Sequence, residues 1–224
     1  LYLYSNALTG SLPPELGNMA SLQSLDVSNN SFSGSLPAAL GNLPFLQSLN
    51  CYNNSFTGSL PPHMGNMRSL QDLNLFNNFL VGTVPTSFSA LTNLVYLQLQ
   101  DNLLSGSLQG VFDTENQADL QVINLSDNAF TGEIADEIFE LPALQSFLAV
   151  SNCLSGSARL LQSLRAWASL DLSYNRLQGE LSSQFGKTSA STDNQTLALE
   201  NNRLSGRVPP PFKARTDIAV LEGN

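Results

Sequence analysis

The sequence is poor in charged residues, and most of the charge that it carries is negative. Only 12% of the 224 residues are charged, with 18 Asp and Glu against 9 Lys and Arg. Residues 1 to 150 contain one basic residue, Arg68. A protein that binds nucleic acid needs cations that displace the counterions of the phosphates. The composition therefore argues against a nucleic-acid partner, and it leaves open whether the acidic surface selects a partner or is only solvated.

Residues that carry catalytic or metal chemistry are equally scarce. The one histidine, His63, stands in the loop PPHMG, away from any repeated nucleophile. Cys51 falls at a position that is apolar in other repeats, so we expect it to be buried, and Cys153 lies roughly 20 Å away, too far for a disulfide. Eight carboxylates between Asp113 and Glu140 lack the spacing of a calcium loop and indicate a solvated face. We therefore expect no enzyme, no metal and no cofactor.

Long hydrophobic runs are also missing. No stretch approaches the eighteen or more apolar residues that a membrane helix needs, so we expect no membrane contact by this segment. The chain begins within a repeat, at LYLY, and ends at LEGN without a recognisable cap. We interpret it as a segment of a longer protein that is incomplete at both ends.

A repeated unit fills the whole sequence. The stretch LQSLDVSNNSFSG from Leu22 returns as LQSLNCYNNSFTG from Leu46, LQDLNLFNNFLVG from Leu70 and LVYLQLQDNLLSG from Leu94. One asparagine marks the same point of each unit, and a glycine follows four residues later: Asn6, Asn30, Asn54, Asn78, Asn102, Asn128, Asn152, Asn175 and Asn202. This nearly constant period predicts a solenoid in which each turn is buried only on its neighbours.

The pattern within one unit predicts its local structure. Leu22, Leu25 and Val27 alternate with polar Asp26 and Ser28, as in a short strand with one buried face. Successive strands should stack into a parallel sheet, with the asparagine forming a hydrogen-bonded ladder at the following corner and the glycine at a second bend. Extra residues in QGVFDTENQAD and FGKTSASTDNQ should lie in surface loops.

The segments that follow each glycine carry a family resemblance. GSLPPELGNM, GSLPAALGNL, GSLPPHMGNM and GTVPTSFSAL resemble the plant-type leucine-rich repeat of receptor-like kinases, receptor-like proteins and polygalacturonase inhibitors. The resemblance implies one solenoid over residues 1–224. It also implies a concave parallel sheet, short 3-10 or polyproline segments on the convex side, and an extra short strand after the glycine. Residues 203–224 would form the last repeat before a C-terminal cap. Proline is replaced at Gln109, Ala135, Arg159 and Ser182, where we expect a less regular convex side.

The variable strand positions offer the best candidate for a binding surface. No Lys, Arg or His appears in the outward-pointing columns, whereas aromatic rings and amides are grouped in adjacent turns. Rings give apolar platforms and amides give directional hydrogen bonds, although the rings could equally pack on one another. The candidate ligand-binding residues are Tyr52, Phe76, Tyr96, Asp72, Asn50, Asn74, Gln98 and Gln100.

Four sequons indicate an extracellular or cell-surface glycoprotein. The acceptor asparagines are Asn29, Asn53, Asn124 and Asn194. Two function classes follow. The first is a receptor-like recognition module that binds a protein, peptide or carbohydrate on its concave face. The second is a glycosylated matrix or filament protein whose repeats act as a scaffold and whose uncapped ends self-associate.

Overall fold

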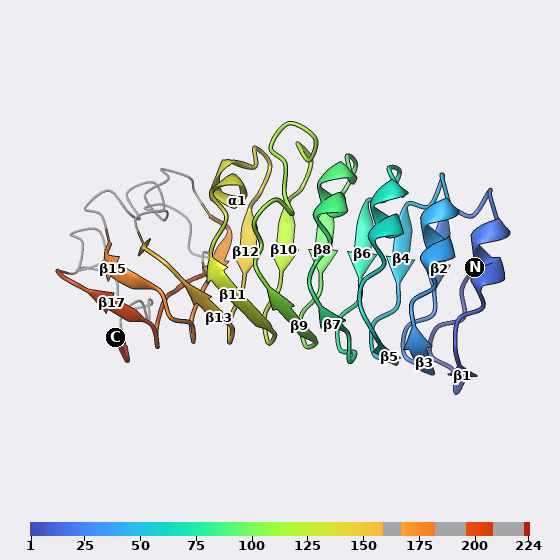
Figure 1. Cartoon of the computed structure of the whole chain (residues 1–224), viewed down its shortest axis with the longest axis horizontal. Coiled ribbons are helices and arrows are strands. Elements are labelled where there is room, and N and C mark those ends of the chain that lie inside the picture. Colours follow the sequence, from blue (N-terminus) through green and yellow to red (C-terminus); the bar gives the residue numbers. More distant parts are fainter. Residues whose placement is uncertain (159–166, 182–195, 208–221) are drawn as a thin grey trace.

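The structure, a computed structural model, describes residues 1–158, 167–181, 196–207 and 222–224. They form an elongated arc of stacked turns, which confirms the leucine-rich repeat solenoid (Figure 1). The predicted excursion after Phe185, the positions Arg159 and Ser182, and most of the expected final repeat lie outside the described residues. Domain bounds beyond them stay predictions.

The concave side is a parallel sheet of eight three-residue strands. Each strand pairs with those of the turns before and after it, in the order β16-β14-β12-β10-β8-β6-β4-β2. The constant period keeps equivalent residues opposite each other, as where Leu25 pairs with Leu49. The strands are β2 (Ser24–Asp26), β4 (Ser48–Asn50), β6 (Asp72–Asn74), β8 (Tyr96–Gln98), β10 (Val122–Asn124), β12 (Ser146–Leu148), β14 (Ser169–Asp171) and β16 (Thr196–Ala198).

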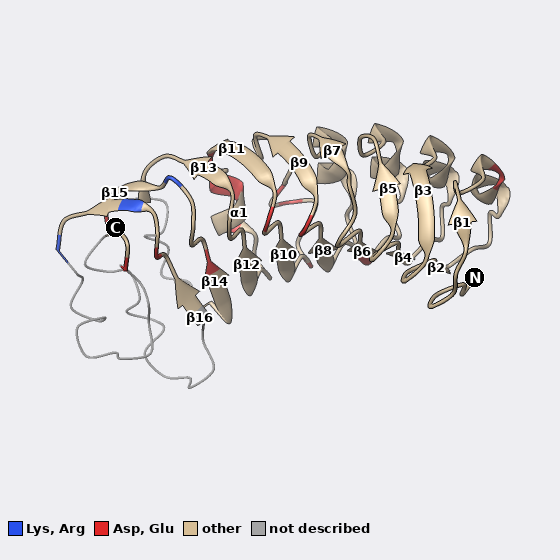
Figure 2. Ribbon diagram, turned by 90° about the horizontal axis from the view of Figure 1, so that it is seen from below, with Lys and Arg blue, Asp and Glu red and all other residues tan. Residues whose placement is uncertain are grey.

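Smaller parallel sheets run along one side of the arc (Figure 2). They differ from the concave sheet in register, because Ser33 pairs with Ser55 and not with its equivalent in the next repeat, Thr57. The glycine lies within most of these strands, as Gly34 does in β3, and directly after the others, as Gly58 does after β5, so the strand expected after the glycine begins earlier. The strands are β1 (Thr9–Gly10), β3 (Ser31–Ser35), β5 (Ser55–Thr57), β7 (Val81–Gly82), β9 (Leu103–Gly106), β11 (Ala129–Glu133), β13 (Cys153–Ser155), β15 (Gln178–Glu180) and β17 (Arg203–Ser205).

Short helices form the convex side where the sequence has proline. Each of four 3-10 turns follows a proline in an extended conformation, which fixes the backbone just before the helix begins. They are η1 (Pro14–Asn18), η2 (Ala38–Asn42), η3 (Pro62–Asn66) and η4 (Thr86–Ala90). Less order is expected where Ala135 replaces proline, but the chain forms the α-helical turn α1 (Asp136–Glu140) there. Carboxylates at Asp136 and Glu137 stabilise its N-terminal end.

The core runs through the whole stack between the sheet and the helices. Its leucines and phenylalanines come from every described turn, and Cys51 is fully buried among them, as predicted. The repeated asparagines form the predicted ladder. The side chain of Asn54 binds three carbonyl oxygens, of Val27, Cys51 and Tyr52, and accepts a hydrogen bond from the backbone of Phe32. Buried polar backbone groups at each corner thereby find partners.

Two features of the corner were missed from the sequence. The residue before each ladder asparagine has a left-handed backbone, as at Asn29 with φ 51°, and mostly Asn or Asp occupy this position. The ladder also extends to a tenth residue, Asn224, whose side chain accepts from Leu204 and donates to Leu199. The signal was present in the ending AVLEGN, which repeats the sequence pattern of the strand and corner.

Candidate functional site

The structure brings all eight predicted ligand-binding residues together on three neighbouring turns. In the register of β4, β6 and β8, Asp72 stands opposite Tyr96, and Asn74 stands between Asn50 and Gln98. Tyr52, Phe76 and Gln100 follow two residues after the ends of these strands. A hollow lined in part by Ser48 and Asn50 opens beside them. We call the eight residues the concave patch.

Two of the three aromatic rings pack on each other. Tyr52 and Phe76 are stacked with their ring centroids 6.5 Å apart and their planes at 26°, and both are half-buried. Tyr96 stands apart from this pair and is 41% exposed. The packing interpretation therefore holds for Tyr52 and Phe76, whereas Tyr96 is a separate, exposed ring, and ligand binding by these rings stays a prediction.

The amides of the concave patch are only partly used by the protein. Asn74 accepts a hydrogen bond from the backbone of Phe76 at 3.2 Å through its side-chain oxygen, so its side-chain N–H groups are not used in that bond. Asn50 donates to the hydroxyl of Ser48 over a long 3.3 Å. These groups can donate to carbonyl or hydroxyl oxygens of a ligand without breaking a strong internal bond.

The charged side chains on the described strands of the concave sheet are all negative. Asp26 and Asp171 each accept hydrogen bonds from the serine two residues later, Ser28 and Ser173. Burial, and then the negative charge of Asp26, raises the pKa of Asp72. The described arginines lie off the concave strands: Arg68 comes four residues before β6, and the others, Arg176, Arg203 and Arg207, come before β15, in β17 and after β17. A cation would be attracted to this surface and an anion repelled.

The other predicted site residues lie elsewhere. Asn29 and Asn53 stand in adjacent turns, where Asn53 donates to the side-chain oxygen of Asn29 at 2.8 Å. Asn124 lies on concave strand β10 and is half-buried. Asn194 lies outside the described residues. Occupancy of these four sequons stays a prediction.

A second regular surface was missed from the sequence. Along β1, β3 and β5 the outward positions are small hydroxyl residues, and the register sets Ser33 opposite Ser55 and Ser35 opposite Thr57. The sequence pattern S-x-S-G-S could have indicated this surface. Stacking of the repeats explains the same pattern equally well. The exposed members of this hydroxyl face are Thr9, Ser11, Ser31, Ser33, Ser35, Ser55, Thr57 and Ser59.

Metal clusters and membrane helices are absent from the described ranges. Nowhere in them do three or more His, Cys, Asp or Glu residues gather as metal ligands would. Within the same ranges, no helix combines the length and the apolar character that are needed to cross a bilayer.

Comparison with known proteins places this geometry in a family. The Leucine Rich Repeat model matches residues 1–19, 21–43, 45–67, 69–91, 119–141 and 168–188. No curated protein matches the chain.

Solved structures match nearly the whole chain. Over 99% of it, the chain is similar to the PEPR1 chain of the PEPR1-AtPEP1 complex, with 32% identity and a TM-score of 0.85. It is also similar to the plant peptide hormone receptor RGFR1 in complex with RGF2, with 30% identity and a TM-score of 0.75 over 99% of the chain. The chain spans only 34% and 39% of those two proteins, less than half of either.

One further match is of a different kind. A plant ice-binding protein is 28% identical over 99% of this chain, with a TM-score of 0.71, and the match covers 80% of that protein. All of these relatives share the parallel sheet and stacked turns described above. The chain belongs to the leucine-rich repeat family, and it resembles the plant-type extracellular members of that family.

Proposed function

We propose that this segment is a non-enzymatic, extracellular recognition module whose concave patch binds a peptide segment. The observation that carries the proposal is the rigid Tyr52 and Phe76 ring pair, half-exposed on an open sheet and flanked by amides with unused N–H groups. Aromatic anchors beside directional hydrogen-bonding groups are typical of the central residues of binding surfaces.

The similarity to receptors that were solved with peptides supports this proposal. The RGFR1 structure contains RGF2, and HAESA, an Arabidopsis receptor kinase that is 28% identical to this chain, was solved with a peptide hormone. Rings and amides also suit a carbohydrate, so both classes of ligand belong in the experiment.

A display experiment tests the proposal without a known ligand. A phage library of random dodecapeptides would be selected on the 224-residue chain, and the enriched peptides would be synthesised and their dissociation constants measured by calorimetry. A glycan array would be probed in parallel. We expect peptide binding that weakens by about tenfold or more in the double variant Tyr52→Ala, Phe76→Ala, because loss of a buried aromatic anchor costs about 2 kcal/mol or more.

Phe45→Ala is the matched control. Phe45 is 60% exposed and lies after η2 on the convex side, so its removal should leave binding unchanged. Peptides that bind equally well to the double variant would place the binding surface elsewhere. The scaffold alternative would be favoured instead if no peptide is enriched and sedimentation shows a mass that rises with protein concentration.

The hydroxyl face favours a second candidate function, the binding of ice. Its hydroxyls repeat about every 4.8 Å across the strands and about 6.6 Å along them, which is a rigid two-dimensional lattice of small, uncharged groups. Among the described residues, the first charge to interrupt the outward positions of the side sheets is Glu133 in β11. The similarity to a plant ice-binding protein over 80% of its length supports this candidate.

Ice binding has a direct readout. The chain should inhibit recrystallisation of ice in a cooled sucrose film, and Thr57→Lys should abolish the effect because a bulky, hydrated charge interrupts the lattice. His63→Lys introduces the same side chain on exposed η3 and should have no effect. Equal activity of both variants, or none in the original chain, would contradict this candidate.

A further inference from the structure

Two side-chain oxygens of the concave patch lack a hydrogen-bond donor. Asp72 Oδ1 and Gln100 Oε1 are shielded from solvent, yet neither accepts a hydrogen bond from a described residue. The third such oxygen in the described part of the chain, Glu200 Oε2, lies beyond β16 at the far end of the sheet. Shielded acceptors in native proteins nearly always have a partner, so these two oxygens point to a donor that a ligand would supply.

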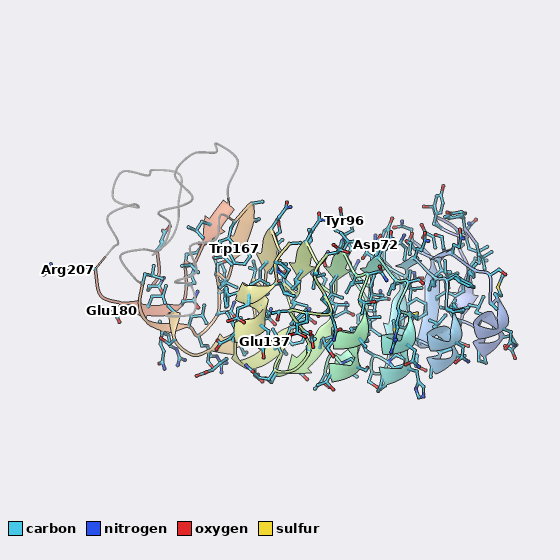
Figure 3. The ribbon with its side chains drawn as sticks, turned by 90° about the horizontal axis from the view of Figure 1, so that it is seen from above. Asp72, Tyr96, Glu137, Trp167, Glu180 and Arg207 are labelled. Carbon is cyan, nitrogen blue, oxygen red and sulfur yellow. The ribbon has the colours of Figure 1, made fainter. Side chains whose placement is uncertain are left out.

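The surroundings of Asp72 define the kind of donor. Its neighbours across the strands are Ser48 on β4 and Tyr96 on β8. Asp72 and Tyr96 lie on the same face of the molecule (Figure 3). The outward positions of the described concave strands carry no Lys, Arg or His, and Asp26 adds a second negative charge nearby. The carboxylate therefore has no cation of these strands to compensate it.

A basic side chain meets these conditions best. A guanidinium has five N–H donors and no acceptor, and it forms strong charge-assisted bonds with a carboxylate. Its flat surface also stacks on aromatic rings, which Tyr96 offers in an exposed position. A neutral sugar hydroxyl could donate to Asp72 Oδ1, but it would leave the negative charge of the carboxylate uncompensated.

We propose that Asp72 binds a basic side chain, arginine in preference to lysine, of a peptide that lies on the concave patch against Tyr96. Gln100 accepts an N–H group of the same peptide about 13 Å further along the strand direction, four residues from Tyr96. This inference rests on the proposed peptide-binding function and names the charge of the ligand. The electrostatics agree with it, since partial burial and then the negative charge of Asp26 raise the pKa of Asp72.

The experiment uses the peptides selected on the full 224-residue chain. For each, one basic residue at a time would be replaced, arginine by the neutral isostere citrulline and lysine by glutamine. Binding would be measured to the original chain and to Asp72→Asn. We expect one replacement to weaken binding to the original chain by about tenfold or more, and the same replacement to change binding to Asp72→Asn by less than about twofold. Asp119→Asn, which removes an exposed carboxylate just before β10, should behave as the original chain.

The outcomes separate this inference from the function on which it rests. Peptides that need Tyr52 and Phe76 but contain no basic residue would overturn the inference and leave the peptide-binding function standing. An equal effect of the replacement in the original chain and in Asp72→Asn would do the same. If no peptide depends on Tyr52 and Phe76, both proposals fail. Neutral oligosaccharides that bind the original chain and Asp72→Asn alike would also overturn the inference.

Discussion

Asn54 donates a hydrogen bond from its side-chain nitrogen to the backbone carbonyl of Val27, 3.0 Å away in the preceding turn. The oxygen of the same side chain accepts from the backbone N–H of Phe32, also in the preceding turn, at 3.0 Å. One buried amide therefore satisfies both a donor and an acceptor of a neighbouring turn, and equivalent bonds recur at Asn78, Asn102 and Asn152.

Replacing this asparagine should be costly. Asn54→Ala leaves a buried N–H and a buried carbonyl without partners, so we expect the free energy of unfolding to fall by about 2–4 kcal/mol. Urea unfolding followed by circular dichroism measures the change. Asn42→Ala, at an exposed position of η2, should change it by less than about 0.5 kcal/mol, and similar losses in the two variants would contradict the role of the ladder.

Alanine substitutions at two glycines separate the steric cost of an added side chain from the cost of backbone strain. A Cβ at Gly41 would collide with the backbone carbonyl oxygen of His63 in the next convex turn, whereas a Cβ at Gly10 would meet nothing within 4 Å. Gly10 has φ +85°, so Gly10→Ala should cost about 1 kcal/mol from backbone strain alone. We expect Gly41→Ala to cost about 3 kcal/mol or more in the same unfolding measurement, and an equal cost would show that the turns can move apart.

The two cysteines should differ in reactivity. Burial in the core, and then the charge of Asp26, raises the pKa of the Cys51 thiol, whereas Cys153 is partly exposed. The thiolate is the reactive form, so a thiol reagent such as iodoacetamide should label Cys153 in the folded chain and Cys51 only after unfolding. Peptide mapping by mass spectrometry distinguishes the two sites. Labelling of Cys51 at the rate of Cys153 in the folded chain would argue against the buried position.

Asp72 predicts a pH-dependent stability. Its pKa in the folded chain is raised above 3.8, so the folded state binds this proton more tightly than the unfolded state does. The resulting stabilisation is fully present below about pH 3.8 and is lost as the pH rises through the raised pKa. Asp72→Asn should therefore stabilise the chain at pH 7 and lose that advantage in acid. The gain should be under about 1 kcal/mol, because solvent screens a half-exposed group.

Unfolding midpoints between pH 3 and pH 7 test this expectation. Among the described residues, Asp26 is the charged group that shifts the pKa of Asp72. Asp119→Asn serves as the control. The difference in stability between this variant and the original chain should not change between pH 3 and pH 7. A variant Asp72→Asn that is less stable than the original chain at every pH would show that the carboxylate makes a favourable internal contact.

The sequence predicted the repeated parts of the fold because they obey a simple period. Alternation in LQSLDVS placed β2 and its equivalents, and each ladder asparagine before Asn224 was identified by its spacing. The helical turn α1 was not predicted, because the absence of proline at Ala135 was taken as a loss of order, whereas Ala135 adopts the same extended conformation as the prolines, with φ -63° and ψ 131°, and a helical turn follows it. The tenth asparagine, Asn224, was missed because it is the last residue of the given sequence, so the spacing to a glycine could not be applied to it.

For the concave patch, the sequence predicted which residues lie in adjacent turns but not how their side chains pack. The constant repeat length was sufficient to place Tyr52, Phe76 and Tyr96 in adjacent turns. Whether two rings stack depends on side-chain rotamers, which the period does not determine, and the structure joins Tyr52 to Phe76 while leaving Tyr96 separate. The shielding of Asp72 Oδ1 depends likewise on how neighbouring side chains cover it.

The direction of the ladder bonds has a consequence for synthesis of the chain. Each asparagine completes the hydrogen bonds of the turn before it, so a turn that has just emerged from the ribosome still has open backbone groups. They are satisfied only when the next asparagine, about one repeat later, has also emerged. Folding during translation should therefore lag one turn behind the emerged part of the chain, and a nascent chain exposed only as far as Asn53 would still lack the hydrogen bond that Asn54 accepts from Phe32.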